Sequence, residues 1–345
     1  MLSKRERLNK VLEGKLADRP PVTAYRHFPK EERKPEELAN IMLDWQNKYD
    51  WDFIKIHPSA VFMQEVYGDI FEWETYVEEI FPKKIKKATN NDDLSIFVKK
   101  DMNNSVLKDH VEVVKLIKNG LTEDVPIFHT LFTPLTVITN MFECPFVRRH
   151  FPADRKENKI FDIIKNRKEE LLKALNNITD TYIEYWKAMR KAGADGLFYA
   201  GIAWAREDYM TYEEWEEFVK QFDIKFLNEV KKDGGKIIYH TCGMTSNPQR
   251  FIDYPIDILH WDQGAGNPSI KELAKPLGKI IPMGGVDEMI FGNNKEKEIA
   301  KQTIAAVTEN KDIPFILAPY CSVSIYSTEK ELRAFRDNAD CLLKK

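Results

Sequence analysis

The sequence has few of the features that mark secreted, membrane-bound or nucleic-acid-binding proteins. Its 345 residues include only four cysteines, too few for a disulfide scaffold, so we expect reduced thiols and a cytoplasmic location. No apolar run approaches the roughly 20 residues of a bilayer-spanning helix, and the charged N-terminus does not resemble a signal peptide. The 52 basic and 55 acidic residues give a net charge of −3. We therefore expect neither a membrane nor a nucleic acid as partner.

The chain also lacks low-complexity tracts, internal repeats and flexible linkers, which predicts one domain over residues 1–345. Ser3 and Glu6 have the spacing of a capping box and predict an N-terminal helix, with chance as the alternative. Eight short runs rich in β-branched and aromatic residues follow, and helical patterns separate them. These runs are residues 21–26, 52–57, 125–132, 196–201, 236–242, 256–261, 279–284 and 314–321.

Eight strands that alternate with helices predict an α/β fold, a single (β/α)₈ TIM barrel with an N-terminal helix and extra insertions. The clearest helical pattern runs from Leu171 to Met189, where apolar residues recur every three or four positions. The long interval between Tyr67 and Glu123 is expected to hold extra helices or a hairpin. An open, doubly wound sheet is the alternative, because hydrophobic patterns do not show whether a sheet closes.

A possible metal site lies where three of these strands would end. The active site of a barrel lies at the carboxyl ends of its strands. His240 and Cys242 are two residues apart and would face the same side, and Cys321 ends the eighth run. One imidazole and two thiolates suit Zn²⁺, with a fourth position open for substrate. The alternative is a hydrogen-bonded core histidine and two cysteines that act as small buried hydrophobic residues.

Other side chains near the predicted strand ends are candidates for catalysis and substrate binding. The candidate catalytic residues are Asp262, Asp287 and Tyr199. The candidate substrate-binding residues are Arg26, His57, Trp204 and Glu207. The two aspartates could act as general bases or orient a zinc-bound histidine, and loop capping or a salt bridge is their alternative role. Packing is the alternative role of His57 and Trp204.

Five short segments, taken in order, carry a family resemblance over nearly the whole chain. They are Asp18–Val22 (DRPPV), Tyr239–Gly243 (YHTCG), Trp261–Gln263 (WDQ), Gly284–Met289 (GGVDEM) and Phe315–Cys321 (FILAPYC). The set resembles the uroporphyrinogen decarboxylase superfamily, and more closely its cobalamin-linked branch, which includes the methylcobamide:coenzyme M methyltransferases. That branch has a His-x-Cys…Cys zinc motif, which His240, Cys242 and Cys321 match position by position.

The decarboxylase branch of the superfamily differs from this chain in two segments. It has an arginine-rich MRQAGRY-like segment after the first strand, whereas the segment here reads AYRHFP and keeps only Arg26. It also needs an aspartate at the end of the second strand, where this chain reads FIKIHP over residues 53–58. The resemblance therefore favours the methyltransferase branch, with a metal-free uroporphyrinogen decarboxylase as the alternative.

The resemblance implies a zinc-dependent enzyme that moves a methyl group between a corrinoid (cobalamin) and a thiol or other small molecule. A zinc-bound thiol loses its proton, and the resulting thiolate is the competent nucleophile. We expect the corrinoid on a separate partner protein, because the chain has no region left for a cobalamin-binding domain. A non-catalytic barrel that binds a partner, with a structural metal at most, is a third possibility.

Overall fold

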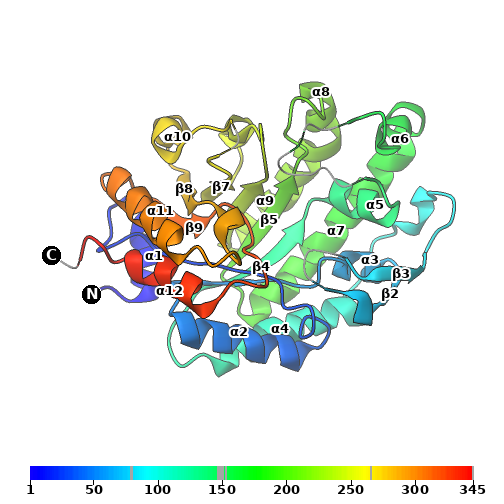
Figure 1. Cartoon of the computed structure of the whole chain (residues 1–345). Coiled ribbons are helices and arrows are strands. Elements are labelled where there is room, and N and C mark those ends of the chain that lie inside the picture. The colour runs from blue at the N-terminus through cyan, green and yellow to red at the C-terminus, as the bar shows by residue number, and fades with distance from the viewer. Residues whose placement is uncertain (78–80, 146–150, 152–153, 265, 344–345) are drawn as a thin grey trace.

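The computed structural model describes residues 1–77, 81–145, 151, 154–264 and 266–343. Seven parallel strands form one curled sheet, and helices cover its outer side (Figure 1). In spatial order the strands are β1 (Ile54–Ile56), β4 (Ile127–Phe132), β5 (Gly196–Ile202), β6 (Lys236–Thr241), β7 (Ile258–Trp261), β8 (Ile281–Val286) and β9 (Ile316–Pro319). Because all neighbours are parallel, their carboxyl ends lie at one edge.

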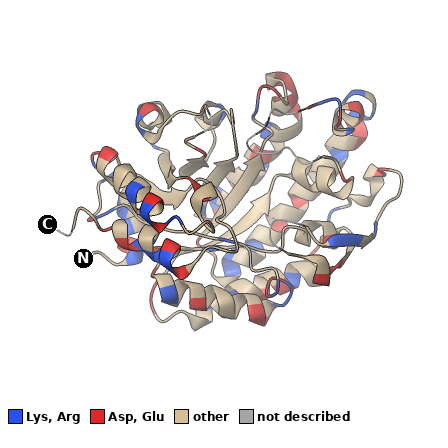
Figure 2. Ribbon diagram, viewed as in Figure 1, with Lys and Arg blue, Asp and Glu red and all other residues tan. Residues whose placement is uncertain are grey.

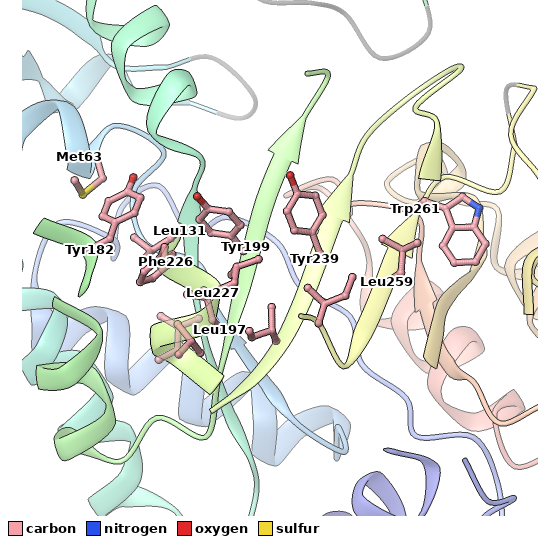
Figure 3. Close-up of a cluster of buried hydrophobic side chains, with 14 of the residues drawn as sticks. Met63, Leu131, Tyr182, Leu197, Tyr199, Phe226, Leu227, Tyr239, Leu259 and Trp261 are labelled. Atoms are coloured by element: carbon pink, nitrogen blue, oxygen red, sulfur yellow. The ribbon is translucent and has the colours of Figure 1, made fainter. Parts of the chain in front are cut away.

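Alternate residues of these strands face opposite sides of the sheet and enter two separate hydrophobic cores. Phe198 and Ile238 belong to the inner core, which the curled sheet encloses. Tyr199 and Tyr239, their neighbours in sequence, belong to the outer core between the sheet and the helices (Figure 3). Both faces of the sheet are therefore buried, which explains why the strands appear in the sequence as nearly continuous apolar runs.

Helices connect the strands and cover the outer side of the sheet. They are α1 (Lys4–Leu12), α2 (Pro35–Tyr49), α3 (Phe62–Val66), α4 (Ser105–Gly120), α5 (Pro134–Met141), α6 (Ile160–Asn166), α7 (Lys168–Ala192), α8 (Tyr212–Trp215), α9 (Gln221–Lys232), α10 (Ile270–Leu277), α11 (Glu296–Glu309) and α12 (Glu329–Asn338). Charged side chains of both signs are spread over these helices and the loops (Figure 2). In the described part of the chain, no helix is long and apolar enough to cross a bilayer.

Shorter elements complete the chain and confirm the predicted insertion. The described residues include the 3₁₀ turns η1 (Trp73–Thr75), η2 (Leu94–Ile96), η4 (Pro248–Phe251) and η5 (Glu288–Ile290) and the π-helical turn η3 (Glu216–Lys220). The interval from Tyr67 to Glu123 holds an antiparallel pair, β2 (Ile70–Glu72) and β3 (Lys83–Lys86), followed by η2 and α4.

The structure corrects the prediction of eight regular strands in a closed ring, because residues 21–26 form no strand. Within that run, Val22 makes an isolated parallel bridge to Leu317 of β9. On the other side of the run, the amide of Asp52 donates to the carbonyl of Val22 at 2.9 Å. A regular ladder is prevented because Pro21 has no N–H and the amide of Val22 donates instead to the Asp52 carboxylate, at 2.7 Å. The run thus lies between β9 and β1 and bonds to both without completing the ring as a strand.

The N-terminal helix α1 closes the amino end of the sheet. Its predicted capping box, Ser3 with Glu6, is present. Arg7 donates to Asp52, two residues before β1, at 2.6 Å, and apolar side chains of α1 enter the inner core. Arg5 likewise donates to a carboxylate directly before β5 at 2.8 Å. Since α1 fills the amino end of the inner core, a site can lie at the opposite end, where the carboxyl ends of the strands meet.

Candidate metal centre

The three predicted metal ligands converge at the carboxyl end of the sheet. His240 lies near the end of β6, Cys242 directly follows that strand, and Cys321 lies two residues beyond β9. The Sγ atom of Cys321 is 3.9 Å from Sγ of Cys242 and 3.8 Å from Nε2 of His240. All three ligand atoms lie within 4.8 Å of one another. A tetrahedral zinc ion with bonds of about 2.1 Å to nitrogen and 2.3 Å to sulfur separates its ligand atoms by about 3.6–3.8 Å. The two separations from Sγ of Cys321 match this range closely.

The two cysteines of this cluster are not joined by a disulfide. A disulfide would require a sulfur–sulfur distance of about 2.05 Å, far shorter than the separation seen here. Soft thiolates with an imidazole select zinc over magnesium or calcium, which prefer oxygen ligands. The chemistry of the donor set therefore fits zinc as well as its geometry does.

A strained residue fixes the position of Cys242. Ile202, the last residue of β5, has a φ of 50°, which is a rare conformation for a β-branched side chain. Its carbonyl accepts a hydrogen bond from the amide of Cys242 at 3.0 Å. The pairing of β5 with β6 also shifts register between Ala200 and Ile202. Such strain persists where surrounding structure enforces it, often at functional sites, and here it directs a carbonyl at a candidate ligand.

A second histidine, His260, supports the cluster from β7. Its ring centroid lies 4.6 Å from that of His240. Nε2 of His260 is 2.8 Å from the carbonyl oxygen of Pro319, which can only accept, so Nε2 carries the proton. Nδ1 therefore accepts from the Tyr25 hydroxyl at 3.1 Å. Burial, together with nearby His240, lowers the pKa of His260 well below its usual value, so this ring is neutral and ties β7 to the segment before Cys321.

Neither Asp262 nor Asp287 makes the hydrogen bond to Nδ1 of His240 that would orient this ring. Among the described residues, Nδ1 of His240 is buried without a hydrogen-bond partner. Asp262 accepts instead from the amide of Gly264 at 2.7 Å, and Asp287 accepts from the amide of Met289 at 2.8 Å. Both carboxylates thus cap loops, which was their alternative role. A role as general base stays a prediction.

His57 lies in this region, and it is accompanied by a lysine that the sequence analysis missed. Nε2 of His57 is 2.8 Å from Nζ of Lys55 and 3.0 Å from Oγ of Ser322, the residue after Cys321. Burial, reinforced by the charges of Lys55 and two histidines, lowers the pKa of His57 well below its usual value. Lys55 lies in β1 and His57 directly follows this strand, so the same spacing of two residues that related His240 to Cys242 could have found this pair.

Two predicted site residues face away from the cluster. Tyr199 lies on the outer face of β5, where its hydroxyl donates to Asp223 of α9 at 2.9 Å (Figure 3). Arg26 donates to the carbonyl of Ile325 at 2.6 Å, and its guanidinium lies 5.0 Å from the ring centroid of Trp45. These contacts involve none of the three candidate ligands. The catalytic role of Tyr199 and the substrate-binding role of Arg26 stay predictions.

The two remaining candidates lie in the loop after β5. Nε1 of Trp204 donates to Oγ1 of Thr136 at 2.8 Å, and Trp204 lines a small pocket together with Ile202. The pocket thus adjoins the residue that holds Cys242, and its other walls are partly polar. Glu207 is exposed and accepts from Asn247 at 3.0 Å, which links this loop to the loop after β6.

The curled parallel sheet and the His-Cys-Cys cluster at its carboxyl end define an α/β protein of barrel type with a candidate catalytic metal centre. Residues 3–341 match the family model described as Uroporphyrinogen decarboxylase (URO-D), and the chain belongs to this family. Among curated proteins, none matches the chain.

Several solved structures share the fold. A methyltransferase from Methanosarcina mazei has a TM-score of 0.78 and 19% identity, covering 99% of this chain and 100% of its own. A B12-independent methionine synthase from Shewanella sp. W3-18-1 has a TM-score of 0.59 and 14% identity, covering 90% of this chain and 87% of its own. A putative vitamin-B12 independent methionine synthase from Listeria monocytogenes has a TM-score of 0.55 and 14% identity, covering 94% of this chain and 97% of its own.

Proposed function

We propose that this chain is a zinc-dependent methyltransferase that moves a methyl group between a corrinoid protein and a thiol or other small molecule. The observation that carries the proposal is the convergence of His240, Cys242 and Cys321 at spacings suited to a tetrahedral ion. Three protein ligands leave one position for substrate, as in catalytic zinc sites. The shared fold with the Methanosarcina mazei methyltransferase and the family match add support.

In this proposal the protein's own residues hold and orient the reactants. Nε2 of His240 and the two sulfur atoms would bind the ion, and Ile202 and His260 would keep the strands that carry these ligands in place. Zinc supplies one chemistry, the stabilisation of a substrate thiolate at neutral pH. The pocket beside Trp204 would receive the organic part of the small molecule, so that its reactive atom is held in line with the methyl group.

The corrinoid protein would approach the carboxyl end of the sheet, because α1 occupies the amino end. None of the four cysteines, all in the described part of the chain, forms a disulfide, which suits the reducing conditions of the cytoplasm, where we place the enzyme. Uroporphyrinogen decarboxylase, the activity in the family's name, is the alternative. Against it, the one arginine kept in the first segment, Arg26, is bonded to Ile325.

The proposal is tested by mixing the zinc-loaded protein with methylcobalamin and a panel of thiols and following loss of the cobalt–carbon bond by absorbance. We expect turnover that a chelator and the Cys321→Ser substitution abolish, whereas Cys341→Ser, which changes a cysteine outside both the cluster and the pocket beside Trp204, leaves it intact. The same preparations are offered uroporphyrinogen. Decarboxylation that is indifferent to the chelator and to Cys321→Ser would contradict the proposal and favour the alternative.

A further inference from the structure

Lys55 is a lysine buried inside the curled sheet, close to the candidate metal centre. Its residue is 2% exposed, and Nζ lies 4.2 Å from the ring centroids of both Tyr25 and Phe198. Nζ also lies 2.8 Å from Nε2 of His57. Within the described part of the chain, none of the salt bridges includes Lys55, and no carboxylate hydrogen-bonds to it. Aromatic faces attract an ammonium, but a buried cation without an anion is strongly disfavoured.

The negative charges near Lys55 have two sources. Burial lowers the pKa of Lys55 well below its ordinary value, while charge at Cys321 and at Glu32 acts in the opposite direction. The carboxylate of Glu32 already accepts from the amide of Phe28 at 2.7 Å and from the hydroxyl of Tyr76 at 2.9 Å. The thiolate cluster at Cys321 is therefore the partner whose charge is left for Lys55 to balance.

A short polar chain links Lys55 to the segment that carries Cys321. His57 lies between Nζ of Lys55 and Oγ of Ser322, at 2.8 Å and 3.0 Å from its Nε2. Cys321 and Ser322 follow β9 and have no regular strand pairing of their own. A change at Lys55 can therefore reach the third candidate ligand both through charge and through this chain.

The charge of the centre changes when a thiolate substrate binds. Two cysteine thiolates balance the two positive charges of zinc, and the imidazole adds none, so the centre without substrate is neutral. A bound substrate thiolate gives it one net negative charge, in a buried environment where charge interactions are strong. On the basis of the proposed function, we propose that Lys55 is a positioning residue whose ammonium offsets this charge and thereby favours binding of a thiolate over a neutral ligand.

The test measures ligand binding without methyl transfer. The protein is loaded with Co²⁺, and 2-mercaptoethanol is titrated while the thiolate-to-cobalt absorbance in the near ultraviolet is followed. Lys55→Met removes the charge and the hydrogen bond, whereas Lys55→Gln keeps an N–H donor for His57 and removes only the charge. We expect both variants to bind Co²⁺ and to bind the thiol about tenfold more weakly or worse. Imidazole, a neutral ligand for the same position, should bind all three proteins alike.

The control is Lys100→Met, because Lys100 also lies over an aromatic ring, that of Tyr67 at 5.4 Å, but outside the cluster. It should leave the thiol affinity unchanged. Wild-type thiol affinity in Lys55→Gln would overturn the charge role, and equal weakening of thiol and imidazole would show a general disturbance of the site instead. If the wild-type protein binds the thiol more tightly than the Lys55 variants and yet transfers no methyl group, that result would contradict the proposed function alone. A wild-type protein that binds cobalt but no thiol would overturn both.

Discussion

The Sγ atoms of Cys242 and Cys321 lie 3.9 Å apart, although 79 residues separate them in the chain. The two cysteines follow β6 and β9, and two other strands, β7 and β8, lie between these in the sheet. Only the curvature of the sheet can bring such ends together. Their proximity is thus a property of the whole fold, and a metal ion bound there would tie the two sides of the inner core to each other.

We predict that Cys242→Ser and Cys321→Ser each lower zinc content strongly while the protein stays folded. A hydroxyl is a poorer zinc ligand than a thiolate, and the two hydrophobic cores do not depend on these rim residues. Metal analysis of purified protein, alongside circular dichroism, measures both effects. Cys144→Ser should keep its zinc. Full zinc occupancy in both cluster variants would refute the assignment of ligands.

His260→Phe should weaken zinc binding by about ten- to a hundredfold, the usual effect of losing a residue that supports a ligand. The substitution keeps a ring beside His240 but loses the hydrogen bond to the carbonyl of Pro319. His129→Phe is the matched control, because His129 is also buried but bonds to Tyr185 on the outer face. Competition with a chromophoric chelator gives both affinities. Equal affinities in the two variants would show that His260 does not position the cluster.

The strand runs could be predicted from the sequence because burial on both faces leaves an apolar signal. Seven of the predicted runs overlap the strands of the seven-stranded sheet. The prediction of a strand at residues 21–26 was wrong because a hydrophobic pattern does not show which hydrogen bonds the backbone makes. The amide of Val22 donates to the Asp52 carboxylate, a contact across 30 residues that no local pattern shows. For the same reason, a hydrophobic pattern does not show whether a ring of strands closes.

Strand register explains two outcomes. It explains why the shared direction of His240 and Cys242 could be predicted, and why Tyr199 was expected on the wrong face of the sheet. His240 lies in β6 and Cys242 directly follows it, so their common direction follows from their spacing of two residues. Tyr199 lies on a different strand, and its direction depends on the pairing of β5 with β6, in which Ala200 and not Tyr199 is opposite His240. Lys55 was missed because it lies within an apolar run and its neighbours in space, Tyr25 and Phe198, come from other segments.

Asp52→Asn should cost stability without removing zinc. The carboxylate of Asp52 is fully buried and accepts from Arg7 at 2.6 Å, from the amide of Val22 at 2.7 Å and from Arg19. Arg7 and Arg19 keep the carboxylates of Asp18 and Asp340 as partners. We therefore expect a loss of about 3 kcal/mol, the lower end of the usual cost of breaking a buried ion pair. Urea unfolding measures the loss, and metal analysis of the folded fraction measures zinc. Loss of zinc in folded Asp52→Asn would mean that the amino end of the sheet controls the centre.

Asp223 should make the free energy of unfolding fall as pH rises from about 4 to about 7. Burial raises the pKa of this carboxyl to about 7, although three tyrosine hydroxyls donate to it. The native protein therefore holds a proton that the unfolded chain has lost above about pH 4, and the stabilisation present below that pH disappears as pH rises through the native pKa. The slope contributed is at most about 1.4 kcal/mol per pH unit.

Asp223→Asn is uncharged throughout and should lack this contribution. Urea unfolding of both proteins at several values between about pH 4 and 8 gives the two slopes. The zinc content of the variant should match the wild type, because Asp223 lies on the outer side of the sheet. Parallel slopes in the two proteins would exclude Asp223 as the titrating group.

The measurement that tests the central claim most directly is the zinc X-ray absorption spectrum of the protein before and after addition of 2-mercaptoethanol. Our account predicts two sulfur ligands at about 2.3 Å and one imidazole nitrogen at about 2.0–2.1 Å, with a third sulfur at about 2.3 Å once the thiol is present. These ligands would be Cys242, Cys321 and His240, and the added sulfur would occupy the open position. A spectrum with two sulfur ligands that does not change with thiol, or one with four protein ligands from the start, would contradict a catalytic zinc centre at this site.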